Sequence, residues 1–133
     1  MSTALVLDAS VGVKWFRDEP GSAEARHLLR DHGEGRISLI APSIFQFEVL
    51  DVARRHFGVA GARAVWDSIS RDGIALLGVD PELTARIFDI CERLGCTTYD
   101  AAAPALAEYL NCGLVSADRR AHGGFDGVRL IGE

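Results

Sequence analysis

The 133 residues are enough for one domain with a sizeable core, and a hydrophobic content of 48% and a charged content of 25% are ordinary for a soluble globular protein. The formal net charge of −5 argues against a broad surface that coats nucleic acid, but not against an enzyme that grips a phosphodiester through metal ions held by acidic residues. Because no apolar run is long enough to span a bilayer and no charged-then-apolar leader precedes Leu5, we expect a cytoplasmic protein without a membrane anchor.

The first predicted element is a buried strand that ends in a carboxylate. The apolar residues from Ala4 to Leu7 suit a strand covered on both faces of a parallel sheet. Asp8 follows directly, where such a strand leaves the sheet, and open α/β folds bind their ligands at that edge. Taken alone, however, Asp8 is better explained as the N-cap of the next helix.

The chain then continues with three helices and one strand. The predicted elements are a helix over 9–16, a helix over 22–32, a strand over 38–41 stopped by Pro42, and a helix over 44–57 with Ser43 as its N-cap. On the last helix, Glu48 lies one turn from Ile44 and Val52, whose side chains should face a core. A carboxylate there is costly unless it is paired or bound to a metal; the alternative is a Glu at the edge of the apolar stripe that reaches solvent.

The second half of the chain keeps the alternation of helices and strands. We expect a helix over 59–70, a strand over 74–79, a helix from Pro81 to Gly95 capped by Asp80, a helix that opens within Thr97-Thr98-Tyr99-Asp100 and runs to about Asn111, an apolar strand from Gly113 to Asp118, and a last strand over 128–131. Asp100 is easily explained as a helix cap, and Pro104 would kink that helix if it started before Asp100. Asp118 repeats the strand-then-carboxylate pattern of Asp8.

These elements together predict an α/β fold, a three-layer α/β/α sandwich with a mostly parallel central sheet. Asp8 and Asp118 then leave the sheet at one edge, which the start of the Asp100 helix and the face of the Glu48 helix can approach. Four converging carboxylates without a matching lysine repel one another unless cations lie between them, and hard divalent ions such as Mg²⁺ or Mn²⁺ suit oxygen ligands best. Two such ions roughly 4 Å apart can activate a water and stabilise the leaving oxygen of a phosphodiester.

The same segments resemble a known family. They are Leu7-Asp8-Ala9-Ser10, the Glu48 helix after Pro42, Tyr99-Asp100-Ala101-Ala102 and Val115-Ser116-Ala117-Asp118-Arg119-Arg120. In order and spacing they are similar to the PIN domain, specifically the VapC-type toxins of bacterial toxin–antitoxin pairs, over essentially all of 1–133 as a single PIN-like domain. The resemblance implies an endoribonuclease that depends on Mg²⁺ or Mn²⁺, a homodimer, and neutralisation by a VapB-like antitoxin.

The resemblance also assigns roles to particular residues. The acidic residues of the family carry over onto Asp8, Glu48, Asp100 and Asp118, and Ser10 and Ser116 match polar positions that help to hold the metal or its waters. Asp51 stands where the family usually has Asn and would add a fifth carboxylate, and Ala103-Pro104 replaces a bulkier apolar pair. Asp126 could also approach the site, although a turn explains it better.

Two other functions remain open from the sequence. A phosphotransferase with Asp8 as its nucleophile would need a second Asp where Ser10 stands and a Lys after a later strand, whereas Lys14 is the only lysine. A catalytically silent PIN-like module that binds a protein partner is the other alternative; Mn²⁺ binding and cleavage of single-stranded RNA distinguish it from the enzyme.

The remaining side chains of interest concern assembly and packing. Phe47, Phe57 and Trp66 are candidates for a dimer or antitoxin surface, although Trp66 is explained equally well by core packing. The three cysteines and four histidines lack metal-ligand spacing, so we expect small buried thiols and histidines that are exposed or internally hydrogen-bonded.

Overall fold

The computed structural model describes residues 3–132, and its central feature is a five-stranded sheet in which every neighbouring pair is parallel. The strands are β1 (Thr3–Leu7), β2 (Ile37–Pro42), β3 (Ala75–Leu77), β4 (Gly113–Ser116) and β5 (Val128–Leu130). Their spatial order is β3-β2-β1-β4-β5. The first strand is therefore central, and the order reverses on either side of it. In parallel α/β sheets a ligand binds at this reversal, beyond the carboxyl ends of the strands.

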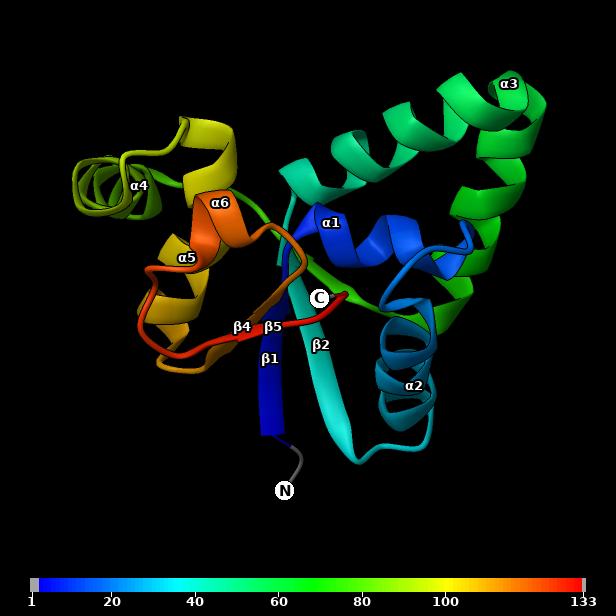
Figure 1. The fold of residues 1–133 in the computed structure, drawn as a ribbon, viewed down its shortest axis with the longest axis horizontal. Helices are drawn as coiled ribbons and strands as arrows, with labels where there is room; N and C mark the ends of the chain where they lie inside the picture. Colours follow the sequence, from blue (N-terminus) through cyan, green and yellow to red (C-terminus); the bar gives the residue numbers. More distant parts are fainter. Residues whose placement is uncertain (1–2, 133) are drawn as a thin grey trace.

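Helices cover both faces of the sheet, as predicted. They are α1 (Ala9–Gly12), the 3₁₀ helix η1 (Val13–Trp15), α2 (Ser22–Gly33), α3 (Ile44–Asp72), α4 (Pro81–Leu94), α5 (Thr98–Leu110) and α6 (Arg119–His122). Figure 1 shows α4, α5 and α6 on one side of the strands, and α1, α2 and the end of α3 on the other. Val6 packs in the core on the α4–α5 side and its neighbour Leu7 in the core on the α2–α3 side, since successive strand residues point to opposite faces. The predicted three-layer sandwich is confirmed.

The long helix α3 consists of two segments that meet at Gly58. This residue has φ 76° and ψ −179°, which lies outside the helical region. Glycine tolerates such a positive φ better than any other residue. The first segment extends away from the sheet edge, and the second returns toward α2 (Figure 1). The two predicted helices, 44–57 and 59–70, are both present, but no loop separates them.

Two expected boundaries were wrong. Ser43 does not cap α3 with its side chain: it has helical backbone angles, and its N–H donates to Leu77 O at 2.8 Å, so the helix begins directly from the paired strand. For the same reason β2 includes Pro42, which is paired with Leu77. At α5 the structure decides between the two starts left open by the sequence: the N-cap is Thr97, whose Oγ1 accepts from Asp100 N at 3.1 Å, so the helix begins before Asp100 and Pro104 lies inside it.

Two further expectations concern membrane-spanning segments and the cysteines. No helix in 3–132 is both long enough and apolar enough to cross a membrane. The three cysteines are free thiols, each half-buried rather than fully buried.

Candidate active site

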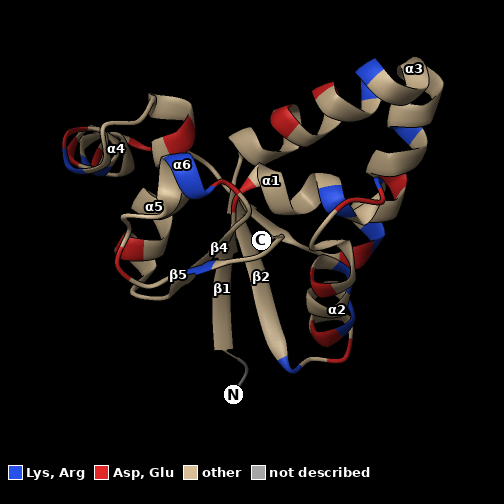
Figure 2. Ribbon diagram, in the orientation of Figure 1, with Lys and Arg blue, Asp and Glu red and all other residues tan. Residues whose placement is uncertain are grey.

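A cleft of about 360 Å³ lies at the carboxyl edge of the sheet, and all four predicted carboxylates line it. Asp8 follows β1, Glu48 lies on the first segment of α3, Asp100 is in the first turn of α5, and Asp118 follows β4. In Figure 2, acidic segments lie before α1 and α6, at the start of α5 and along the first segment of α3. Four segments far apart in the sequence thus contribute negative charge to one site.

Asp8 is both a helix cap and a residue of the cleft. Its N–H donates to Val115 O at 3.1 Å, which extends the pairing of β1 with β4 by one residue. Its Oδ2 accepts from Ser10 N at 3.1 Å and so caps α1. The capping explanation and the functional explanation are therefore compatible, because one carboxylate oxygen is used in each.

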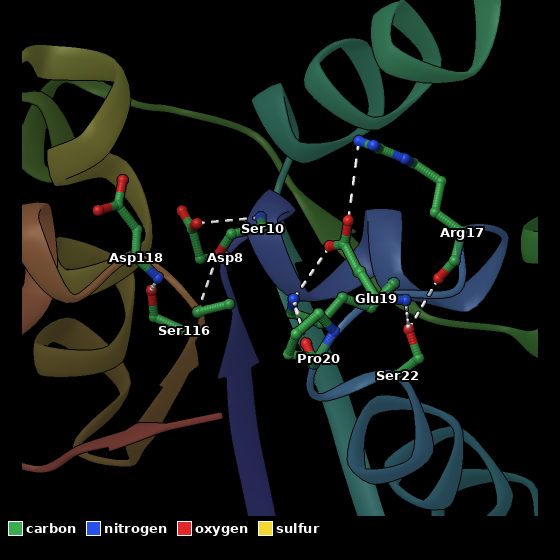
Figure 3. A network of polar contacts seen from close by, with 10 residues as sticks. Asp8, Ser10, Arg17, Glu19, Pro20, Ser22, Ser116 and Asp118 are labelled. Carbon is green, nitrogen blue, oxygen red and sulfur yellow. Dashed lines mark hydrogen bonds and ion pairs between the residues drawn. The ribbon is translucent and has the colours of Figure 1, made fainter. Parts of the chain in front are cut away.

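Asp118 is held in a similar way on the neighbouring strand. Its Oδ1 accepts from Ala121 N at 3.0 Å and caps α6, and its own N–H donates to Ser116 Oγ at 3.0 Å. In Figure 3 the Asp8 and Asp118 side chains point to the same side of the loops that follow β1 and β4. Two carboxylates are thus fixed side by side at the centre of the sheet edge.

The two predicted serines hold the backbone around these carboxylates. Ser10 lines the cleft, and its Oγ accepts from Ala117 N at 2.9 Å, which ties the start of α1 to the loop after β4. Ser116 is fully buried, and its Oγ lies between Asp118 N and His122 Nδ1. Their expected help in holding a metal or its waters stays a prediction.

Glu48 has the most perturbed environment of the site. Burial, and then the negative charges of Asp8 and Asp100, raise the pKa of Glu48 from 4.5 to about 7. Glycine at position 12 lets α1 approach α3 closely, since a Cβ there would lie 2.7 Å from Phe45 Cζ. The alternative of a Glu that simply reaches solvent is therefore disfavoured.

The additional acidic candidates lie differently. Asp51 lines the cleft but is exposed and bound by arginines, at 3.0 Å from Arg54 Nη2 and 3.6 Å from Arg55 Nε. Its charge is largely compensated, unlike that of Glu48. Asp126 is exposed and is not among the residues that line the cleft.

Sequence reasoning did not single out the cations of this site. Arg55 lines the carboxylate cleft, and it lies seven residues, about two helical turns, after Glu48 on the same face of α3. Arg120 lines an adjoining hollow of about 350 Å³ that also includes Asp100 and Asp118. The helical spacing from Glu48 was the available signal for Arg55.

The donor atoms of the cleft suit a hard divalent cation. They are carboxylate oxygens, and their mutual repulsion is evident in the raised pKa of Glu48. Within residues 3–132, no three His, Cys, Asp or Glu side chains are close enough to form a complete metal site by themselves. This open arrangement is compatible with Mg²⁺, which usually keeps several waters and takes only one or two carboxylates.

An α/β/α sandwich with carboxylates gathered at the carboxyl edge of a parallel sheet defines the class of this protein. Residues 5–125 match the PIN domain family, and the chain therefore belongs to that family. No curated protein sequence matches it.

Several solved structures share the fold. The *Mycobacterium tuberculosis* toxin VapC20, described as a Sarcin-Ricin loop cleaving toxin, is similar with a TM-score of 0.73 and 14% identity, covering 94% of this chain and 98% of that one. DNA-bound VapBC from *Salmonella typhimurium* has a TM-score of 0.72 and 18% identity, covering 98% and 97%. VapBC2 from *Rickettsia felis*, bound to a promoter DNA fragment, has a TM-score of 0.72 and 13% identity, covering 97% and 99%. At these identities the likeness concerns the fold.

Proposed function

We propose that this protein is a metal-dependent endoribonuclease, the VapC-type toxin of a type II toxin–antitoxin pair, whose single domain spans 1–133. The observation that carries the proposal is the convergence of Asp8, Glu48, Asp100 and Asp118 on one cleft, where burial and then the charges of Asp8 and Asp100 raise the pKa of Glu48. Membership of the PIN domain family supports it, and a solved structure of the same fold is described as a Sarcin-Ricin loop cleaving toxin.

The four carboxylates are the residues that would hold Mg²⁺ or Mn²⁺. When bound, the metal supplies an activated water and stabilises the leaving oxygen of the phosphodiester. Glu48, whose pKa is near 7, can release a proton at its carboxyl group when a cation enters the cleft. Arg55 and Arg120 each line a hollow that includes Asp100 and Asp118, and we propose that they contact phosphates of a single-stranded or structured RNA.

The burial and the hydrogen bonds of Lys14 argue against the phosphotransferase alternative. This lysine is buried, and its Nζ donates to Glu19 Oε1 at 2.9 Å and to Pro20 O at 2.7 Å. It is therefore unable to neutralise a phosphate in the cleft. The silent PIN-like module remains the alternative, and the next experiment separates it from the enzyme.

Cleavage of RNA by the purified protein is expected to require Mg²⁺ or Mn²⁺, because the ion would activate the attacking water and stabilise the leaving oxygen. The measurement is the initial rate on a labelled RNA in Mn²⁺, in Mg²⁺, in EDTA, and in EDTA followed by excess Mn²⁺. Activity should disappear in EDTA and return with Mn²⁺. Equal cleavage in EDTA would refute the metal mechanism, and Mn²⁺ binding without cleavage of any RNA tested would favour the silent module.

The proposed partners are a second copy of this chain and a VapB-like antitoxin, acting in the cytoplasm. The first segment of α3 and its kink expose large apolar side chains: Phe47 is 68% exposed, Phe57 50% and Val59 61%. Trp66 instead packs partly against the core between α3 and the sheet, so it is the weaker candidate. Related solved structures are described as VapBC complexes, which supports a protein partner here.

We expect the wild-type protein to sediment as a dimer at tens of micromolar and Phe47→Ser to shift it toward monomer, because exposed aromatic side chains anchor interfaces. Analytical ultracentrifugation measures both species. Phe88→Ser is the matched control, since Phe88 is similarly exposed, at 59%, on α4. A strictly monomeric wild type, or equal effects of the two substitutions, would contradict a dimer formed through α3.

A further inference from the structure

His122 is a buried residue that joins three elements beneath the cleft. It is fully buried, and both of its ring nitrogens are hydrogen-bonded. Nε2 lies 2.6 Å from Asp100 O, and Nδ1 lies 2.7 Å from Ser116 Oγ. Because a carbonyl oxygen can only accept, Nε2 carries the proton and donates to Asp100. The Ser116 hydroxyl then donates to Nδ1 while its oxygen accepts from Asp118 N at 3.0 Å.

Pro104 explains why Asp100 O is available to His122. In a regular α-helix the N–H of residue 104 would donate to the carbonyl oxygen of residue 100. Proline has no N–H, and its ring displaces that carbonyl, so Pro104 within α5 leaves Asp100 O without its helical donor. Pro104 is itself buried, and His122 provides the missing donor.

The resulting chain of hydrogen bonds connects two carboxylate-bearing residues through their backbones. It runs from Asp100 O to His122, then to Ser116 Oγ, and ends at Asp118 N. Asp100 belongs to α5 and Asp118 precedes α6, so the chain sets the spacing between two different segments of the cleft. The two ends of the chain are backbone atoms of Asp100 and Asp118, so neither carboxylate group takes part in it.

We propose that His122 is a positioning residue that fixes the carboxylates of Asp100 and Asp118 relative to each other. This inference rests on the proposed metal-dependent cleavage. In metal sites, replacing a residue that orients the ligands typically lowers metal affinity or activity by about 10–100-fold. His122 would act in this way through the backbone atoms of Asp100 and Asp118. The donor from His122 is needed because Pro104 has no N–H to donate to Asp100 O.

The test measures Mn²⁺ affinity by calorimetric titration, together with kcat, KM and thermal stability. His122→Leu removes both hydrogen bonds and should weaken Mn²⁺ binding by about 10–100-fold and lower kcat more than KM. His122→Gln keeps an amide that can donate to Asp100 O and should restore much of the affinity. Pro104→Ala gives residue 104 an N–H that can donate to Asp100 O, so His122→Leu should cost less in that background.

The chain offers a matched control in His32. Its Nε2 lies 2.8 Å from Asp72 O and its Nδ1 accepts from Leu39 N at 3.1 Å, the same type of double hydrogen bond far from the cleft. His32→Leu should lower stability while Mn²⁺ affinity stays at the wild-type value. If His122→Leu alone fails to fold, Mn²⁺ affinity is compared between wild type and His122→Gln, and between Pro104→Ala and the His122→Leu/Pro104→Ala double variant; affinity near the wild-type value in His122→Gln and a small loss in the double variant are the expected results.

The outcomes separate this inference from the proposed function. Wild-type Mn²⁺ affinity and kcat in His122→Leu, or an equal loss of affinity in His32→Leu, would overturn the positioning role alone. Additive effects of His122→Leu and Pro104→Ala would do the same, because the proposed coupling passes through Asp100 O. If the wild type neither binds Mn²⁺ nor cuts RNA, the proposed function and the role of His122 both fail.

Discussion

Asp118→Asn and Asp8→Asn are each expected to lower RNA cleavage by about a thousandfold or more while the fold is retained. Loss of a metal-binding charge removes several kcal/mol of transition-state stabilisation, and each ~1.4 kcal/mol is a factor of ten in rate. The fold should survive because the amide oxygen of Asn can still accept the capping bonds from Ala121 N and Ser10 N. Asp100→Asn and Glu48→Gln should behave in the same way.

The rates are measured as initial velocities on a labelled RNA in Mn²⁺, with circular dichroism to verify folding. Asp80→Asn is the matched control, since Asp80 Oδ1 caps α4 through Leu83 N at 2.8 Å and does not line the cleft. It should retain wild-type activity. If Asp8→Asn cleaves RNA as fast as Asp80→Asn does, Asp8 is a helix cap and has no part in catalysis.

The second large effect concerns stability and pH in the metal-free protein. The pKa of Glu48 is raised from 4.5 to about 7 by burial and by the charges of Asp8 and Asp100. Between these two values the folded state keeps a proton that the unfolded state has released. The free energy of unfolding should therefore rise as pH falls from above 7 toward about 5, until general acid denaturation reverses the trend. Above pH 7 the ionised Glu48 lowers stability.

Glu48→Gln removes this titration and should raise the melting temperature at pH 8 by several degrees. After allowance for solvent screening of this half-buried group, the gain is about 1–2 kcal/mol. The difference from wild type should shrink at pH 5.5, where Glu48 is protonated in the fold. Thermal melts in EDTA at both pH values measure it, with Glu92→Gln as the control because Glu92 is exposed on α4. A pH-independent difference would show that Glu48 does not titrate as described.

Mn²⁺ should reproduce the same stabilisation in the wild type at neutral pH. A ligand that binds only the folded state at a hundredfold excess over its Kd stabilises it by roughly 2.7 kcal/mol. Glu48→Gln should weaken the rise in melting temperature, since it removes one of the charges that attract the ion. An undiminished rise in the variant would place the cation away from Glu48.

The local features of the sequence determined the order of the elements and the positions of the carboxylates. The apolar run before Asp8 and the one before Asp118 each form a buried strand of a parallel sheet, so the two aspartates had to leave it at one edge. Asp80-Pro81 and Gly95 bound α4 as expected, because capping depends only on residues a few positions apart.

Other features were decided only by contacts between distant segments. Ser43 is an excellent capping residue by type, yet pairing of its N–H with β3 determines how α3 begins. The raised pKa of Glu48 depends on Asp8 and Asp100, which are 40 and 52 positions away in the sequence. Pro104 indicated a disturbed helix, but the donor for Asp100 O comes from His122, in a different helix. Hydrogen bonding and charge repulsion act over a few ångströms in space, and only the folded chain brings such residues within that range.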